Sequence, residues 1–347
     1  MAETPMSATQ SSVRLRVADP GMVLVAQQHA RRVAKLAGLD AAGADHAALA
    51  AAELAGNAQR HGRAGELLLQ PSAEGAAIDV VAFDRGPGVA DWARSSADGY
   101  STTPGSLGTG LGAVARIATT LTAHSELNRG TVVSARIGPA GNAPMVSAFG
   151  SPRRGERING DAWSWSVSDG EVFAVLADGL GHGPDAAAAS ALAVADVASL
   201  AASEPPQVLH DVHARLRSTR GAAVTVVRLR RSSTGEGSEL LVTGVGNVAA
   251  TVVALDGSVR RTLISAGTAG LAVRTPTQTI TPVPTGSVVV LHTDGLLSSW
   301  TMQGRARVVA APPAVLAAVL LRDFERGTDD TGVVVLRPPA ALDRLDR

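Results

Sequence analysis

The pattern of apolar and polar positions in the first 137 residues alternates between strand-like and helical segments. Residues 13–17, VRLRV, alternate as a half-buried strand does, and Asp19-Pro20 then resembles the start of a helix that extends to Gly38. Helices on an antiparallel or mixed sheet form an α/β sandwich. The further elements expected here are helices over 42–60 and 111–121, strands over 66–69, 76–83 and 131–137, and a glycine-rich loop over 84–112.

After residue 147 the pattern changes to many short apolar runs separated by turn signals. Two longer stretches, 184–202 and 312–325, have helical composition. Many short strands with a few outer helices predict an α+β fold built on a β-sandwich with flanking helices. The expected strands are 163–168, 171–177, 222–230, 239–245, 248–255, 259–264, 286–292 and 332–336.

Length and composition divide the chain. A chain of 347 residues favours two domains, and 45% apolar with 18% charged residues is ordinary globular composition. The segment GPAGNAPMVS (138–147) has the composition of a linker. We therefore expect tails over 1–12 and 339–347, and domains over 13–137 and 148–338.

Charge and cysteine content narrow the possible functions. The formal net charge is zero, so nothing favours binding to nucleic acid or to an anionic membrane. The absence of cysteine excludes disulfides, thiol catalysis and thiolate metal sites, and suits a reducing compartment. The N-terminus has no apolar signal segment, and no stretch approaches 18 apolar residues. We expect a cytoplasmic protein without a membrane span.

Three segments of the first domain point to a nucleotide site. The segment ELAGNAQRH places Glu53, Asn57 and His61 on one helical face, although the solvent side of a helix would give the same pattern. An amide oxygen such as that of Asn57 suits Mg²⁺ shared with phosphates. In DRGPG (84–88), the carboxylate of Asp84 follows an apolar run, where it can accept the exocyclic amine of a purine.

Glycines complete this pattern. Gly86 and Gly88 let a base approach the backbone, and GSLGTGLG (105–112) leads directly into a helix, whose N-terminal N–H groups favour phosphate. The three segments together resemble the GHKL (Bergerat) ATPases, most closely the anti-sigma-factor and switch-kinase branch of RsbW and RsbT. This resemblance implies an ATP site formed by Asn57, Asp84, Gly86, Gly88, Gly108, Gly110, Gly112 and Thr131, with Asn57 as the Mg²⁺ ligand. It also implies serine kinase activity, with Glu53 as the general base.

Acidic residues border the strand-like runs of the second domain. Converging carboxylates without cysteine suit a hard cation such as Mg²⁺ or Mn²⁺, since they repel one another unless a metal neutralises them. A pair of such ions can hold a nucleophilic water for attack on phosphorus. The residues are Asp161 before WSWSV, Asp178 after VFAVLA, Asp294 after SVVVLH, and Asp329 with Asp330 before GVVVLR.

The order GD…ADGxGHG…TDG…DD resembles the PPM-type serine phosphatases of the SpoIIE branch, and RsbX in particular. The resemblance implies two Mn²⁺ or Mg²⁺ ions held by Asp161, Asp178, the carbonyl of Gly179, Asp294 and Asp329. Asp330 is a weaker candidate, because one of two adjacent carboxylates normally points inward. We interpret His182 as a turn residue or a neighbour of the ligands, and Trp163 and Trp165 as packing residues.

These resemblances predict a bifunctional regulator of a stressosome or partner-switching pathway, in which kinase and phosphatase domains act on a STAS-domain protein. Two alternatives stay open at this point. The first domain can be a binding module of the anti-sigma type, or an ATP sensor that gates the phosphatase. The presence of both Glu53 and Asn57 favours the kinase without excluding binding.

Overall fold

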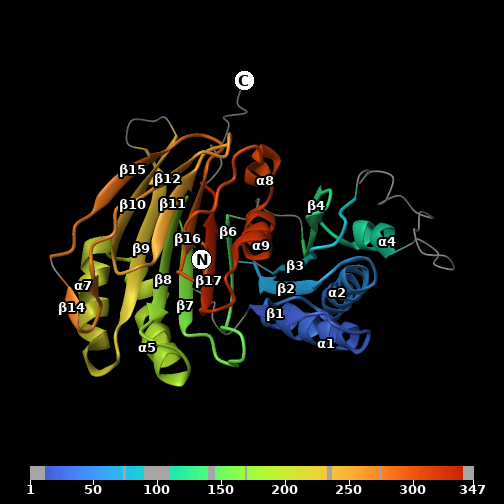
Figure 1. Cartoon of the computed structure of the whole chain (residues 1–347), viewed down its shortest axis with the longest axis horizontal. Helices are drawn as coiled ribbons and strands as arrows, with labels where there is room; N and C mark the ends of the chain where they lie inside the picture. Colours follow the sequence, from blue (N-terminus) through green and yellow to red (C-terminus); the bar gives the residue numbers. More distant parts are fainter. Residues whose placement is uncertain are drawn as a thin grey trace. The chain divides into compact units, whose positions relative to one another are not determined.

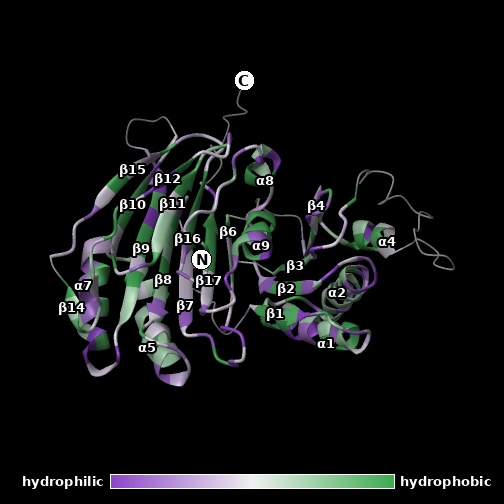
Figure 2. Cartoon of the chain, in the orientation of Figure 1, coloured by the Kyte–Doolittle hydropathy of each residue, from purple (hydrophilic) through white to green (hydrophobic). Residues whose placement is uncertain are grey.

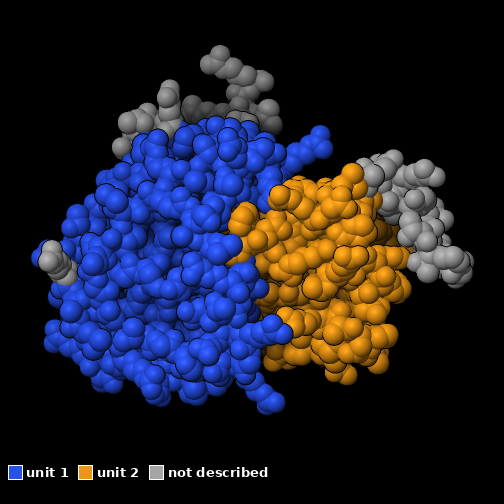
Figure 3. All heavy atoms as spheres, viewed as in Figure 1, with its two compact units in different colours: residues 1–10, 150–310, 325–347 blue, residues 11–149, 311–324 orange. Residues whose placement is uncertain are grey.

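The computed structural model describes residues 12–72, 76–89, 110–139, 145–168, 170–232, 237–273 and 275–338. The contacts within it divide the chain into two compact units (Figure 3). The first unit, orange in Figure 3 and labelled unit 2 there, contains residues 11–149 and 311–324. The second unit, blue and labelled unit 1 there, contains residues 150–310 and the chain from 325 onwards. Within the described residues, no helix is long and apolar enough to cross a membrane.

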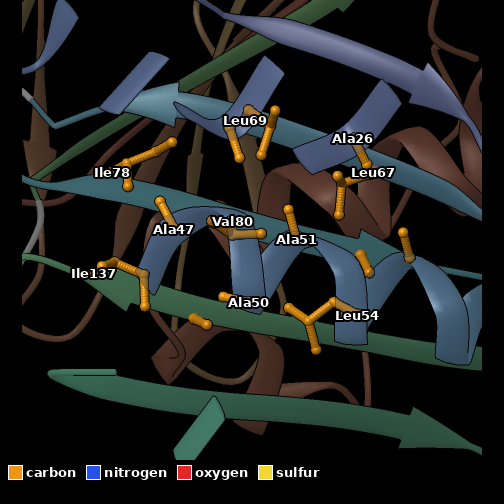
Figure 4. Close-up of a cluster of buried hydrophobic side chains, with 14 of the residues drawn as sticks. Ala26, Ala47, Ala50, Ala51, Leu54, Leu67, Leu69, Ile78, Val80 and Ile137 are labelled. Carbon is orange, nitrogen blue, oxygen red and sulfur yellow. The ribbon is translucent and has the colours of Figure 1, made fainter. Parts of the chain in front are cut away.

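The first unit is built on a five-stranded antiparallel sheet of order β1-β2-β3-β5-β4 (Figure 1). Its core forms because alternate side chains of β2, β3 and β5 face the helices α1, α2 and α4 (Figure 4). The strands are β1 (Val13–Arg16), β2 (Glu66–Pro71), β3 (Ile78–Phe83), β4 (Thr120–Glu126) and β5 (Gly130–Ile137). The helices are α1 (Gly21–Leu36), α2 (Ala41–His61), α4 (Gly110–Ile117) and α9 (Pro313–Phe324).

Helix α2 carries the polar residues of the nucleotide segment. It begins after Asp40, whose Oδ1 accepts a hydrogen bond from the Gly43 N–H at 2.8 Å and so satisfies one free donor of the helix start. Buried alanines let this helix pack closely on α1 and on the sheet. The side of α2 that carries Glu53 and Asn57 stays partly exposed.

The opposite face of the same sheet is buried too. Leu68, Val81 and Phe83 alternate with the residues that face α2, and all three are fully buried. Helix α9 packs on β3, β5 and β4 and is not part of the core formed with α1, α2 and α4. It therefore covers this second face.

The second unit contains two antiparallel five-stranded sheets, of order β15-β10-β9-β8-β7 and β12-β11-β16-β17-β6 (Figure 1). Helices α5 and α7 pack on the first of these sheets. The strands are β6 (Val146–Ser151), β7 (Asp161–Ser168), β8 (Glu171–Gly179), β9 (Ala222–Arg231), β10 (Ser238–Val245), β11 (Ala249–Val253), β12 (Val259–Arg261), β13 (Gly267–Thr268), β14 (Ala272–Val273), β15 (Thr279–Val283), β16 (Val288–His292) and β17 (Thr331–Leu336). The helices are α5 (Pro184–Val194), α6 (Val197–Ala201), α7 (Pro205–Arg215) and α8 (Ala306–Ala310), with a 3₁₀ turn at Leu216–Ser218.

Several elements differ from the sequence expectation. The helix expected over 111–121 ends at Ile117, and the strand β4 follows, because TLTAHSE alternates with Leu121 and Ala123 toward the core. The helix expected over 184–202 is two helices, since Asp196 adopts a left-handed conformation with φ 58° between them. Strands β6 and β15 and helices α7 and α8 were not expected, and β6 begins within the expected linker.

The compact units also differ from the expected domain boundaries. Residues 311–324 lie within the expected second domain, near its C-terminal end, yet their contacts assign them to the first unit. The chain crosses from one unit to the other inside β6, at Phe149 and Gly150. Spatial neighbours decide membership of a unit, and a local sequence pattern does not contain that information.

Candidate functional site

The register of the β7–β8 hairpin brings two of the expected metal-site residues together. Asp161 is paired with Asp178 across the two strands, and the Gly179 N–H donates to the Gly160 carbonyl at 3.2 Å. Antiparallel pairing therefore places the Gly160-Asp161 and Asp178-Gly179 dipeptides side by side. A side chain at position 179 has no room, because an added Cβ would lie 2.1 Å from the carbonyl oxygen of Ala186 in α5.

An asparagine connects Asp178 with Asp294, which follows β16. The Nδ2 group of Asn247 donates to Asp178 Oδ2 at 3.2 Å and to Asp294 Oδ2 at 2.7 Å. Asn247 lies in the turn between β10 and β11, after Gly246 with φ +94°. The sequence reasoning missed this residue, because a Gly-Asn pair between two strands indicates only a turn.

Asp161 is held in place by one oxygen only. Its Oδ2 accepts a hydrogen bond from Thr293 Oγ1 at 2.7 Å, and Thr293 Oγ1 in turn accepts one from the Gly332 N–H at 2.9 Å. The other oxygen, Oδ1, is buried and has no hydrogen-bond partner among the described residues. Burial, reinforced by the charge of Asp178, holds the pKa of Asp161 well above its ordinary value. Thr293, directly before Asp294, is a second residue that sequence reasoning missed.

Asp178 has a pKa near neutrality. Burial raises it to about 7, and the nearby charge of Asp294 acts in the same direction, while the hydrogen bond from Asn247 opposes the shift. A carboxylate that carries a proton near pH 7 is poised to exchange this proton for a cation. Burial is the main cause of the shift, and the convergence of acids that the sequence pattern predicted adds to it.

The Asp329-Asp330 pair also reaches this site. The charge of Asp329 acts on Asp178, and that of Asp330 acts on Asp161. Asp330 is the more buried of the two, at 2% exposure, and its Oδ1 accepts the Arg153 N–H at 2.9 Å. Its Oδ2 is buried without a hydrogen-bond partner in the described chain. The structure therefore gives Asp330 a more buried place at the site than the sequence expectation did.

The donor set suits a hydrated hard cation better than a closed cage. Within the described ranges, no group of three or more His, Cys, Asp or Glu side chains is placed to hold a metal ion. Mg²⁺, however, commonly keeps several waters and binds through one or two carboxylates. The pair Asp178 and Asp294, with the unpartnered oxygens of Asp161 and Asp330, offers such oxygen donors.

The other residues singled out in the second unit, His182, Trp163 and Trp165, lie in a turn and in strand β7. His182 lies in the turn before α5, where its Nδ1 is 3.3 Å from Glu156 Oε1. Trp163 and Trp165 are 3% and 4% exposed. The two tryptophans pack in the interior, and the histidine lies at the surface beside the Glu156 carboxylate.

In the first unit, the expected nucleotide residues converge at the end of α2. An added Cβ at Gly110, the first residue of α4, would lie 2.3 Å from Glu53 Oε2. The Glu53 carboxylate therefore lies directly at the start of α4, which links the first and third predicted segments. Asn57 Oδ1 accepts a hydrogen bond from Arg60 Nη2 at 3.1 Å.

Asp84 lies in a cradle of backbone at the end of β3. Its Oδ1 accepts the Gly86 N–H at 2.7 Å, and an added Cβ at Gly62 would lie 2.4 Å from the Asp84 Cβ. Its N–H donates to the carbonyl oxygen of Thr131 at 3.0 Å. Burial raises the pKa of Asp84, against the opposing effect of the Gly86 and Thr131 hydrogen bonds and of the Arg322 charge.

The other glycines expected in the nucleotide site lie in different surroundings. Gly88 has φ +74°, and an added Cβ there would lie 2.3 Å from the Glu126 carbonyl oxygen, so only glycine fits. Gly112 is buried within α4. Gly108 lies outside the described residues. His61 lies near Asp84, and its pKa is lowered, first by burial and then by Arg60.

Comparisons with known families support both domains. Residues 16–137 match the family model described as Histidine kinase-like ATPase domain, and residues 168–339 match the model described as Stage II sporulation protein E (SpoIIE). The chain is a fusion of these two domains. Its first domain is accordingly kinase-like, and its second is a SpoIIE domain. The expected fold class, a GHKL ATPase fold followed by a PPM β-sandwich, is confirmed.

Individual relatives cover one domain each. The ATPase domain is 29% identical over 123 residues to the serine/threonine-protein kinase RsbT of Bacillus subtilis (strain 168), covering 35% of this chain and 92% of RsbT. A chain from "The bacterial stressosome: a modular system that has been adapted to control secondary messenger signaling" is 25% identical, with a TM-score of 0.49, 56% of this chain and 98% of that chain covered. RsbX in complex with magnesium is 20% identical, with a TM-score of 0.47, 55% of this chain and 92% of RsbX covered.

Proposed function

We propose that this fusion protein is a two-way switch for a serine in a STAS-domain protein. The ATPase domain phosphorylates the serine and the SpoIIE domain removes the phosphate. The observation that carries this proposal is that one chain contains both sites. A general-base candidate, Glu53 of α2, lies beside the start of α4. Two acids, Asp178 and Asp294, are joined by hydrogen bonds from Asn247. The match to RsbT over most of its length supports the kinase half.

The phosphatase chemistry rests on the acidic site of the second unit. We assign the metal-holding roles to Asp161, Asp178, the Gly179 carbonyl, Asp294 and Asp329. Two bound Mn²⁺ or Mg²⁺ ions would supply a water of lowered pKa for attack on phosphorus. The contribution of the chain is to keep the carboxylates close together, with Asn247 and Thr293 fixing the oxygens of three of them.

The kinase chemistry rests on the pocket of the first unit. Asp84 would accept the amine of adenine, and the N–H groups at the start of α4 would face the phosphates. Asn57 would ligate Mg²⁺, with Arg60 holding its amide in place. Glu53 would take the proton of the substrate serine hydroxyl. The serine oxygen then attacks the γ-phosphate of ATP, and ADP leaves.

Fusion gives a reason for opposite activities on one substrate. A partner bound to one domain is kept at high effective concentration near the other domain of the same chain. A phosphate adds about −1.5 to −2 charge at neutral pH, which changes how a protein docks to its partners. The setting of the switch then depends on the relative rates of the two reactions.

The test uses a STAS-domain protein from the same host, ATP and full-length protein carrying Asp294→Asn. We expect phosphoserine to accumulate on the STAS protein, and to stop accumulating when Glu53→Ala is added, with ATP still bound. Wild type should remove the phosphate only when Mn²⁺ or Mg²⁺ is present. Complete hydrolysis in EDTA would refute the phosphatase assignment. Failure of the Asp294→Asn protein to phosphorylate any STAS protein of the host would refute the kinase half.

A further inference from the structure

Helix α9 has an unusual position in the chain. It lies between Asp294 and Asp329 in the sequence, inside the segment that matches SpoIIE, yet it packs on β3, β5 and β4 of the ATPase sheet. Its sequence PAVLAAVLLRDF is largely apolar (Figure 2), and residues 313–322 are all buried. An element of the SpoIIE segment thus packs on the ATPase sheet.

The C-terminal end of α9 is bound by the residue that follows the adenine-site carboxylate. Arg85 Nε donates to the Arg322 carbonyl oxygen at 2.8 Å, and Arg85 Nη2 donates to the Leu321 carbonyl oxygen at 3.3 Å. The last carbonyls of a helix lack partners within it, and a cation there also compensates the helix dipole. Because Arg85 is directly bonded to Asp84, the nucleotide site and the end of α9 are joined by one peptide bond and one side chain.

Helix α9 also places a positive charge, that of Arg322, near the carboxylate of Asp84. The Arg322 side chain is completely buried and forms two hydrogen bonds to Asp323, at 2.7 and 3.1 Å. Its Nη1 is buried without a hydrogen-bond partner among the described residues. The Arg322 charge opposes the effect of burial on Asp84. A ligand that engages Asp84 therefore changes the surroundings of a buried cation on α9.

The residues directly after α9 are bonded to the phosphatase site. The Arg326 N–H donates to the Gly295 carbonyl oxygen at 2.8 Å, and Glu325 pairs with Leu296 in an antiparallel bridge. Gly295 is the neighbour of Asp294. The chain itself thus leads from the end of α9, through Glu325 and Arg326, to the backbone next to Asp294.

We propose that the ATP site has a second function as a regulatory site of the phosphatase, and that Arg85, the end of α9 and residues 325–326 transmit the effect. This inference rests on the proposed function, namely nucleotide at Asp84 and catalytic metal at Asp178 and Asp294. Small displacements of a catalytic group are enough to change a rate strongly. The coupling is reciprocal, so metal at the phosphatase site also changes the affinity for nucleotide.

The experiment measures hydrolysis of p-nitrophenyl phosphate by the full chain at a fixed concentration of free Mn²⁺, with and without a non-hydrolysable ATP analogue. We expect the saturating analogue to change kcat/KM by about 5-fold or more. Arg85→Met keeps an unbranched apolar side chain but loses the guanidinium that lies over the Phe83 ring. It should keep nucleotide affinity and basal hydrolysis, while losing the response. Arg85→Lys, which keeps the charge but not the forked donors, should reduce the response.

Arg14→Met is the matched control. Arg14 also lies over the Phe83 ring and binds Glu66, the acid that Arg85 approaches to 3.6 Å, but it belongs to the edge strand β1. This variant should keep the full response. As a readout independent of activity, the analogue should change hydrogen exchange of the Arg326 amide in wild type and not in Arg85→Met.

The outcomes separate the inference from the proposed function. Mn²⁺-dependent hydrolysis with bound analogue and no response in wild type would overturn the inference and leave the proposed function intact. A full response in Arg85→Met would also overturn it. A response that survives Asp84→Asn would show the analogue acting elsewhere, against the inference. Absence of Mn²⁺-dependent hydrolysis, or of nucleotide binding, would overturn both.

Discussion

Asn247 binds the carboxylates of both Asp178 and Asp294, so one neutral side chain sets the spacing of two acids that would otherwise repel each other. Thr293 has a similar role toward Asp161. Outer hydrogen-bond partners of this kind orient metal ligands and tune their basicity. At the scale of single residues, the neutral partners determine the arrangement of the acids.

Replacement of this asparagine tests that role. We expect Asn247→Ala to weaken Mn²⁺ binding about 10- to 100-fold, because the carboxylates lose their fixed orientation. Isothermal titration of the metal-free protein with Mn²⁺ measures the effect. Gln207→Ala, which removes an exposed amide bonded to Asp211 on α7, is the control and should leave Mn²⁺ affinity unchanged. Unchanged affinity in Asn247→Ala would contradict the assignment.

The raised pKa of Asp178 predicts a pH dependence of metal stabilisation. Its folded-state pKa is about 7 against an ordinary value of 3.8, so the folded protein holds a proton that the unfolded chain releases. This contribution to stability is fully present below about pH 4 and is lost as the pH rises through about 7. A metal ion competes with this proton. We expect Mn²⁺ to raise Tm more at about pH 8 than at about pH 5, as measured by thermal denaturation against EDTA.

A variant at the same position provides the check. Asp178→Asn removes the titrating group, and the Tm gain from Mn²⁺ should then be small at both pH values. Equal gains at both pH values in wild type would show that Asp178 does not exchange a proton for the metal.

At the scale of elements, the contact of α2 with the start of α4 forms the proposed kinase site. An added Cβ at Gly110 would lie 2.3 Å from Glu53 Oε2, so the two helices meet through a position that tolerates only glycine unless Glu53 moves. In the second unit, the pairing of β7 with β8 places Asp161 opposite Asp178. Each site thus depends on the close approach of two elements.

Substitution of the glycine at the start of α4 tests this contact. We expect Gly110→Ala to displace Glu53 and to reduce phosphorylation of a STAS substrate by about 100-fold, since small misplacements of a catalytic group are costly. Hydrolysis of p-nitrophenyl phosphate should be unaffected. Gly21→Ala at the start of α1, where the added methyl group meets only the exposed Asp19 carboxylate at 3.0 Å, should retain kinase activity. Full kinase activity in Gly110→Ala would contradict a role for Glu53 as the base.

At the scale of the whole molecule, the boundary of the units does not follow the order of the chain. Residues 311–324 complete the ATPase unit, although they follow most of the phosphatase segment. The sheet face formed by Leu68, Val81 and Phe83 is buried in the full chain, and α9 is the helix on that face. The ATPase unit of this chain is therefore made of two separate segments.

This organisation predicts the behaviour of a fragment. A chain of residues 1–144 lacks α9, and we expect it to bind an apolar dye and to unfold at a Tm at least about 4 °C below that of the same fragment with residues 311–324 attached through a flexible linker. Thermal denaturation and dye fluorescence measure the difference. An equal Tm for the two fragments would mean that α9 contributes nothing to the ATPase unit.

The sequence by itself determined the elements and residues whose signals are local. Alternation, glycines and acids next to apolar runs identified β3, β7, β8 and β16 with little error in their bounds, and indicated Glu53, Asp84, Asp178 and Asp294. These signals are local because side-chain periodicity and turn chemistry act over a few residues. The strand β4 was missed because its short alternation follows a helix without a strong breaker.

The tertiary structure alone decided the contacts between distant segments. Asn247 bridges Asp178, which lies 69 residues before it in the sequence, and Asp294, which lies 47 residues after it. Nothing in a Gly-Asn turn indicates that the ends of these strands meet. The packing of α9 on the ATPase sheet likewise depends on which apolar face lies next to it, because the hydrophobic effect has no direction and any such face will serve. The hydrophobic pattern specifies that a helix is buried. Only the folded chain specifies which surface the helix packs against.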